Sequence, residues 1–199
     1  MKVVAIAGGI SSGKSMVCST IEQLGGYFVG VDGLSKNLMD PHSSPSCFDQ
    51  VVKEFGKEIL NNNKIDKCRL GQVLFKTNGF NRIKRIIMPS LFEIVSNEIE
   101  QCRSRNYQYV FVEVPLTYLT ELSSLFDEIV LVVTTRQVER VMKDEKISEK
   151  EAIAIVNSLG VAEDYLNLAT RTITNENGID DLKDQVNELL KQLGWSDVY

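Results

Sequence analysis

The chain has 199 residues, of which 43% are hydrophobic, and it carries a formal net charge of −5 at pH 7. That length can bury one good core, no run approaches the roughly 18–20 apolar residues of a membrane span, and the negative balance argues against general nucleic-acid binding. Length and composition fit a compact cytoplasmic enzyme, and we expect it to bind neither membranes nor nucleic acid.

The N-terminal segment predicts a strand, a glycine-rich turn and a helix. Residues 2–7 are a short β-branched apolar run, typical of a buried strand. Residues 15–24 place Val17, Ile21 and Leu24 at helical spacing. Because the chain starts with a core strand, we expect no cleavable signal sequence there.

The turn between these elements matches G-x-x-x-x-G-K-[ST], the phosphate-binding P-loop. In this motif the backbone N–H groups and the helix dipole hold phosphate oxygens, Lys14 reaches the β- and γ-phosphates, and Ser15 offers its hydroxyl to Mg²⁺. The alternative is a chance glycine turn, which the flanking strand and helix disfavour. The sequence thus predicts binding of ATP and Mg²⁺ by Gly8, Gly9, Ile10, Ser11, Ser12, Gly13, Lys14, Ser15 and Met16.

Strand and helix patterns alternate along the rest of the chain. Further strands are predicted at 27–31, 109–114, 128–133 and 170–174. Helices are predicted at 45–55, 65–75, 80–103 with an interruption or kink at Pro89, 148–158 behind a capping box, and 179–193.

Solid apolar strands separated by helices indicate a parallel sheet that is covered on both faces. We expect one α/β domain over residues 1–199 with a five-stranded sheet, and helical excursions near 40–105 and 136–168. In such sheets ligands bind beyond the carboxyl ends of the strands.

Two acids follow predicted strands at that edge. Asp32 comes directly after the second strand and Glu113 near the end of the third. Either carboxylate could accept a proton from an attacking hydroxyl or orient Mg²⁺ and its waters. Asp32 could instead be a helix N-cap, and Glu113 an acid that only accepts hydrogen bonds from nearby loop N–H groups.

Phosphoryl transfer also needs cations near the moving group. Arg136, Arg140, Lys143, Lys146 and Lys150 follow the fourth strand, interleaved with acids. For most of them a solvated helix with i,i+4 pairs is the better explanation, and Arg140 is the favoured catalytic cation.

Other functional groups are sparse. His42 is the only histidine, so a histidine triad or multi-histidine metal site is nearly excluded. The four cysteines form no C-x-x-C pair and are interpreted as small hydrophobes or surface thiols.

Across its length the chain resembles the dephospho-coenzyme A kinase family. The resemblance is carried by the P-loop with its Gly-Gly-Ile opening, Val31-Asp32, Phe55-Gly56-x-x-Ile59-Leu60, Ile65-Asp66-Lys67-x-x-Leu70, Glu113-x-Pro115-Leu116, Gln137-x-x-Arg140 and Asn175. It implies a nucleoside-kinase-like α/β core, a helical acceptor-binding region and a lid. It also implies transfer of phosphate from ATP to the ribose 3′-hydroxyl of dephospho-coenzyme A.

The resemblance implies roles for individual residues. Asp32 would be the base for the 3′-hydroxyl, and Arg140 would begin the lid. Glu113, with Pro115 and Leu116, would belong to the substrate-binding set. Asn175 would lie in the loop that flanks adenine, and Gly8 to Ser15 would hold the ATP phosphates.

The chain departs from the family pattern at several positions. A glycine of the family P-loop is Ser11, the first acid of D-x-D is Gly30, and a His-Pro pair is Met88-Pro89. In the lid, an arginine position holds Asp144, and a later Arg-Ile-x-x-Gln pattern reads Ile155-Val156-x-x-Leu159.

Three functions therefore stay open at this point. The first is a dephospho-coenzyme A kinase. The second is a P-loop kinase for another small hydroxyl or nucleotide acceptor, and the third is a nucleotide- or coenzyme A-binding protein with weakened catalysis. We expect a monomer or a small homo-oligomer.

Overall fold

The computed structural model describes residues 1–77 and 79–195, which form two compact units. One unit is made of Met1–Gly30 together with the chain from Glu98 onward, and the other is Val31–Asn97.

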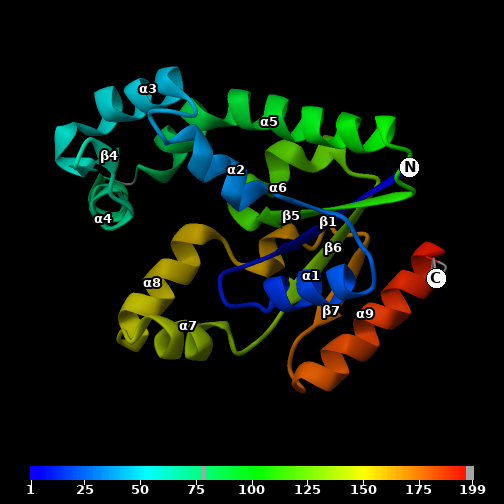
Figure 1. Cartoon of the computed structure of the whole chain (residues 1–199). Coiled ribbons are helices and arrows are strands. Elements are labelled where there is room, and N and C mark those ends of the chain that lie inside the picture. Colours follow the sequence, from blue (N-terminus) through cyan, green and yellow to red (C-terminus); the bar gives the residue numbers. More distant parts are fainter. Residues whose placement is uncertain (78, 196–199) are drawn as a thin grey trace. The chain divides into compact units, whose positions relative to one another are not determined.

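The first unit is built on the expected five-stranded sheet (Figure 1). Its strands are β1 (Lys2–Gly8), β2 (Phe28–Gly30), β5 (Tyr109–Pro115), β6 (Glu128–Val133) and β7 (Arg171–Thr174). They lie in the order β2-β5-β1-β6-β7, and all four pairings are parallel. The α/β fold class and the sheet predicted from the sequence are confirmed.

Helices cover both faces of this sheet, as expected. On one face, α1 (Lys14–Gln23) and α9 (Ile179–Leu193) pack over Val4 and Ile6 of β1. On the other face, α6 (Leu116–Leu122) contacts β5 and β1. Because side chains alternate along a strand, the central strand is buried on both sides, which explains its unbroken apolar sequence.

The predicted lid segment forms two helices, α7 (Gln137–Glu145) and α8 (Glu149–Leu159), which pack through Val141, Ala152 and Val156. The capping box predicted for α8 is present: the Ser148 hydroxyl accepts from the Glu151 N–H, and the Glu151 carboxylate accepts from the Ser148 N–H. A 3₁₀ turn, η3 (Ala162–Tyr165), follows.

The second unit contains α2 (Val31–Leu38), α3 (Pro45–Phe55), the 3₁₀ turn η1 (Lys57–Ile59), α4 (Lys67–Thr77) and the first part of α5 (Phe80–Ser104). An interruption or a kink was predicted at Pro89: the interruption is wrong, since α5 continues as one helix through that residue, and the kink stays a prediction. Among the described residues no helix, the 25-residue α5 included, is long and apolar enough to span a membrane.

This unit also contains a short hairpin that was not predicted from the sequence. Strands β3 (Leu60–Asn61) and β4 (Lys64–Ile65) pair antiparallel. The turn residues Asn62 and Asn63 have φ of 49° and 59°, the left-handed conformation that two-residue hairpin turns require and that asparagine tolerates. The predicted helix at 65–75 therefore begins only at Lys67.

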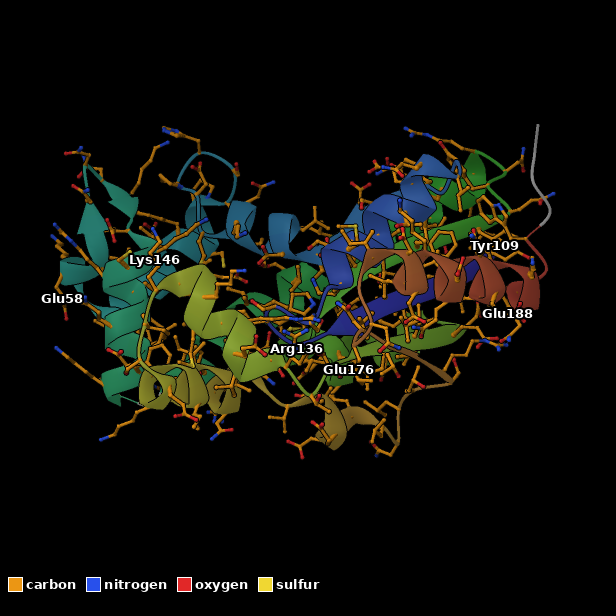
Figure 2. The ribbon with its side chains drawn as sticks, turned by 90° about the horizontal axis from the view of Figure 1, so that it is seen from below. Glu58, Tyr109, Arg136, Lys146, Glu176 and Glu188 are labelled. Atoms are coloured by element: carbon orange, nitrogen blue, oxygen red, sulfur yellow. The ribbon has the colours of Figure 1, made fainter. Side chains whose placement is uncertain are left out.

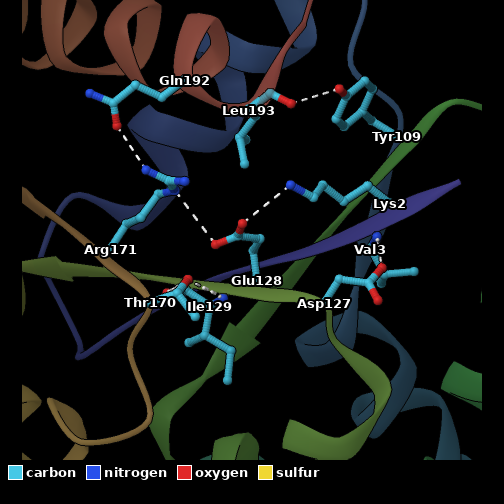
Figure 3. A network of polar contacts seen from close by, with 10 residues as sticks. All are labelled: Lys2, Val3, Tyr109, Asp127, Glu128, Ile129, Thr170, Arg171, Gln192 and Leu193. Atoms are coloured by element: carbon cyan, nitrogen blue, oxygen red, sulfur yellow. Dashed lines mark hydrogen bonds and ion pairs between the residues drawn. The ribbon is translucent and has the colours of Figure 1, made fainter.

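A polar network joins the strand ends opposite the P-loop (Figure 3). The Glu128 carboxylate pairs with Lys2 at 3.2 Å and with Arg171 at 3.5 Å. Arg171 also donates to the Gln192 side chain at 2.8 Å, so β1, β6, β7 and α9 are tied together at this end. The Thr170 hydroxyl and the Lys2 and Arg171 cations hold the pKa of Glu128 below its ordinary value.

This network predicts a pH-dependent contribution to stability from Glu128. Since its folded-state pKa is lowered, the stabilisation is present above the ordinary value of 4.5 and is lost as the pH falls through the folded-state pKa. Glu128→Gln should lower the free energy of unfolding at pH 7 by about 1 kcal/mol. Urea denaturation should show this difference shrinking in acid.

Glu100→Gln is the matched control, because Glu100 forms an exposed i,i+3 pair with Arg103. It should change the stability little at any pH. Equal effects of the two variants at pH 7 would contradict the role given to Glu128.

Candidate active site

The P-loop lies between the end of β1 and the start of α1, as the motif requires. Gly13, directly before the helix, has a φ of 98°, and Ser11 has a φ of 53°. Left-handed residues in a loop that leads into a helix turn successive backbone N–H groups toward one concavity, which suits an anion. The predicted strand, loop and helix are confirmed.

Side-chain amides approach this loop so closely that two of its positions need glycine. A β-carbon on Gly9 would collide with the Gln137 amide nitrogen, and one on Gly13 would collide with the Asn175 amide nitrogen. The positive φ of Gly13 adds a second reason, because residues with a β-carbon rarely adopt it.

The same two amides donate hydrogen bonds to loop carbonyls. The Gln137 Nε2 donates to the Ile10 carbonyl at 3.0 Å, and the Asn175 Nδ2 donates to the Ser12 carbonyl at 2.9 Å. Both side chains are buried, with 9% and 8% of their surface exposed. Buried polar groups of this kind are stable only when they are paired.

Arg140 completes the set. Its guanidinium donates to the carbonyls of Ser11 and Ser12, both at 3.4 Å, and to the Asn175 carbonyl at 2.8 Å. We call Gln137, Arg140 and Asn175 the loop clamp. Because they satisfy the loop carbonyls, they hold the loop in one conformation.

Lys14, Ser15 and Glu113 meet at the end of the sheet. The Lys14 ammonium lies 2.6 Å from a Glu113 carboxylate oxygen, and the Ser15 hydroxyl lies 3.5 Å from the same oxygen. Glu113 pairs in register with Ile6 of β1 and with Gly30 of β2. Three residues predicted for the site are therefore together in the first unit.

The thiol nearest this cluster is inert. Burial, with the Glu113 carboxylate close by, raises the pKa of Cys18 to about 12. Cys18 is protonated at neutral pH and acts as a small apolar residue of the core, as expected.

Asp32 lies in the second unit, where α2 begins at Val31. The N-cap alternative is wrong, because Asp32 is inside the first turn of the helix. Its carboxylate is about half exposed and pairs with Lys36 one turn later. It follows Gly30, the last residue of β2, by two positions.

The remaining predicted residues have distinct settings. Pro115 ends β5 and Leu116 starts α6, and Leu116 is buried, with only 2% of its surface exposed. Asn175 follows β7 and donates to the P-loop. The next residue is Glu176, whose carboxylate accepts hydrogen bonds from Thr135, and these lower the pKa of Glu176. Glu176 also lies close to Arg136 (Figure 2).

The lid segment is neither one helix nor a free loop. Lys143 lies within α7, whereas Lys146 ends it with a φ of 55°. The aspartate at the family arginine position, Asp144, accepts a hydrogen bond from the Ser11 hydroxyl at 2.8 Å. Ser11 and Asp144, two positions at which the chain departs from the family pattern, thus contact each other.

The contact of Gln137 with the P-loop was not predicted, although Gln137 is part of the Gln137-x-x-Arg140 motif. The signal was its spacing from Arg140, since residues three apart lie on one face of a helix. Only the position of α7 beside the P-loop shows that this face donates hydrogen bonds to the loop carbonyls.

Comparison with known proteins agrees with this geometry. A family model described as dephospho-CoA kinase matches residues 2–181. The chain belongs to the dephospho-CoA kinase family. The resemblance and the enzyme class expected from the sequence are confirmed.

Relatives match over nearly the full length. A dephospho-CoA kinase from Carboxydothermus hydrogenoformans is 27% identical over 205 residues, covering 99% of this chain and 97% of the relative. The fold is similar to TT1252 from Thermus thermophilus, with a TM-score of 0.75, 20% identity and coverage of 96% and 97% of the two chains. It is also similar to a dephospho-CoA kinase from Campylobacter jejuni, with a TM-score of 0.66, 21% identity and coverage of 97% and 98%.

The loop clamp predicts that Asn175→Asp damages nucleotide binding. The change keeps the shape but turns a carboxylate oxygen toward the Ser12 carbonyl, so a buried donor is replaced by a charged acceptor. The free energy of unfolding should fall by about 1–3 kcal/mol, and the affinity for MgATP should fall about tenfold or more. Denaturant unfolding and calorimetric titration measure the two effects.

Asn157→Asp makes the same chemical change at an exposed position of α8 and serves as the control. It should leave both quantities near their wild-type values. Wild-type MgATP affinity in Asn175→Asp would show that the loop does not depend on this donor.

Proposed function

We propose that this member of the family transfers the γ-phosphoryl group of ATP, bound with Mg²⁺ at the P-loop, to the ribose 3′-hydroxyl of dephospho-coenzyme A. The observation that carries the proposal is the convergence of Lys14, Ser15 and Glu113 beside a P-loop that the loop clamp holds in place. The family model supports the choice of acceptor over other small alcohols.

The donor set fits a magnesium-bound triphosphate. Backbone N–H groups and the Lys14 ammonium suit phosphate oxygens, and the Ser15 hydroxyl suits a hard cation. Within residues 1–77 and 79–195 no cluster of three or more histidine, cysteine, aspartate or glutamate residues could hold a metal by itself. The ion would therefore arrive with the nucleotide, and when bound it neutralises charge on the phosphates.

Lys14 and Glu113 neutralise one another before the nucleotide arrives. Phosphate oxygens compete for the Lys14 ammonium, since they offer more negative charge than one carboxylate. The Glu113 carboxylate would then be released next to the Ser15 hydroxyl, the group that would hold the ion, and would be free to accept other hydrogen bonds there. In this account the pair keeps Lys14 extended along the loop until the ligand binds.

Asp32 is the proposed general base. The 3′-oxygen attacks the γ-phosphorus, its proton passes to the Asp32 carboxylate, and the bond from phosphorus to the ADP oxygen breaks. Support comes from the chain path, because β2 ends level with Glu113 and Asp32 follows two residues later.

Arg140 is proposed as the cation of the lid segment. Its guanidinium donates to the Ser11 and Ser12 carbonyls, so its first role is to stabilise the conformation of the P-loop.

The second unit is proposed as the acceptor-binding region. It contains a cavity of about 520 Å³ lined by Pro41, His42, Phe48, Leu60, Asn62, Asn63 and Lys64. Apolar walls with a few hydrogen-bonding groups are typical of sites for amphipathic small molecules.

The base assignment predicts that Asp32→Asn lowers turnover about 100-fold or more while the fold stays intact. The substitution keeps the size of the side chain and removes its ability to take up a proton. Its exposed pair with Lys36 contributes little to stability, so thermal unfolding should barely change. Steady-state kinetics with dephospho-coenzyme A measure the effect.

Asp184→Asn, at an exposed position of α9, is the control for loss of one negative charge. Its turnover should match the wild type. If Asp32→Asn keeps more than about a third of wild-type turnover, the proton goes elsewhere and the base assignment is wrong.

A further inference from the structure

One carboxylate lies directly against the loop that is proposed to bind phosphate. The Asp144 Oδ2 accepts from the Ser11 hydroxyl at 2.8 Å, and Ser11 is a P-loop residue in the left-handed conformation. Asp144 is exposed and sits one residue before the end of α7. Its charge therefore lies beside the loop, positioned by α7, and remains open to solvent.

The same helix holds Ser11 from two sides. Arg140 and Asp144 are four residues apart, so they share a face of α7. Arg140 donates to the Ser11 carbonyl, whereas Asp144 accepts from the Ser11 hydroxyl. The Arg140 guanidinium donates its hydrogen bonds to the carbonyls of Ser11, Ser12 and Asn175. These hydrogen bonds do not involve the Asp144 carboxylate.

An anionic group at an anion-binding loop disfavours a highly charged ligand. Metal-free ATP carries more negative charge than its magnesium complex, so repulsion by a nearby carboxylate acts more strongly on the metal-free form. Lys14 attracts both forms. Glu113 is paired with Lys14 before either binds, and the charge it regains when Lys14 moves to the phosphates is the same in the wild type and in an Asp144 variant. Asp144 contacts the loop through the Ser11 hydroxyl.

We propose that Asp144 is a specificity-determining residue, which makes the P-loop discriminate against nucleotides whose phosphates are not neutralised by a divalent cation. The inference rests on the proposed function in one respect, namely that the P-loop binds ATP. A purely structural role, in which Asp144 only fixes Ser11, would change the affinities for both forms of ATP by the same factor.

The test measures the dissociation constant of ATP by calorimetry at low ionic strength, once with excess MgCl₂ and once with EDTA. The readout is the ratio of the metal-free constant to the magnesium constant. In Asp144→Asn this ratio should fall about fivefold or more, mainly because metal-free ATP binds more tightly. The difference from the wild type should shrink at high salt, as expected for an exposed charge.

Two further variants separate charge from hydrogen bonding. Glu145→Gln removes the same charge from the next residue of α7 and should keep the wild-type ratio. Ser11→Ala removes the hydrogen bond but leaves the Asp144 charge, so its ratio should stay within about twofold of the wild type.

An unchanged ratio in Asp144→Asn, or equal shifts of both constants, overturns the inference and leaves the proposed function standing. A wild-type protein that binds neither form of ATP overturns the proposed function and this inference together.

Discussion

The site depends on how the carbonyl groups of the P-loop are satisfied. A loop that turns its N–H groups toward a ligand turns carbonyls toward the protein, and these need donors. Gln137 and Asn175 supply buried amides and Arg140 supplies a guanidinium. The sheet order makes this possible, because β6 lies beside β1 and β7 lies beside β6, so the segments that follow β6 and β7 reach the loop after β1.

Charges around the loop are paired before any ligand binds. Lys14 is paired with Glu113, and Arg140 is satisfied by backbone carbonyls. A nucleotide must therefore replace the Lys14–Glu113 ion pair with contacts of its own, since the site does not offer an unpaired positive charge there. Against this background the carboxylate of Asp144 at Ser11 gives the loop a built-in bias against excess negative charge on the ligand.

Local patterns made much of this structure predictable. The five strands, the P-loop and the capping box at Ser148 depend on neighbouring residues, and all were found in the sequence. The hairpin at Asn62 was missed because its strands are only two residues long, too short for a periodic signal. The hydrogen bonds that Gln137 and Asn175 donate to the P-loop could not be derived from local patterns, since each joins residues more than 120 positions apart in the chain.

The central claim is that the chain phosphorylates dephospho-coenzyme A with ATP. The most direct test incubates the protein with MgATP and a panel of acceptors, namely dephospho-coenzyme A, a free nucleoside and a non-nucleotide alcohol. ADP release is followed, and the product is analysed by mass spectrometry and phosphorus NMR. Of the three acceptors, only dephospho-coenzyme A is predicted to cause ADP release, and its product should carry a new phosphate on the ribose 3′-oxygen. Turnover of another acceptor with none of dephospho-coenzyme A would contradict it.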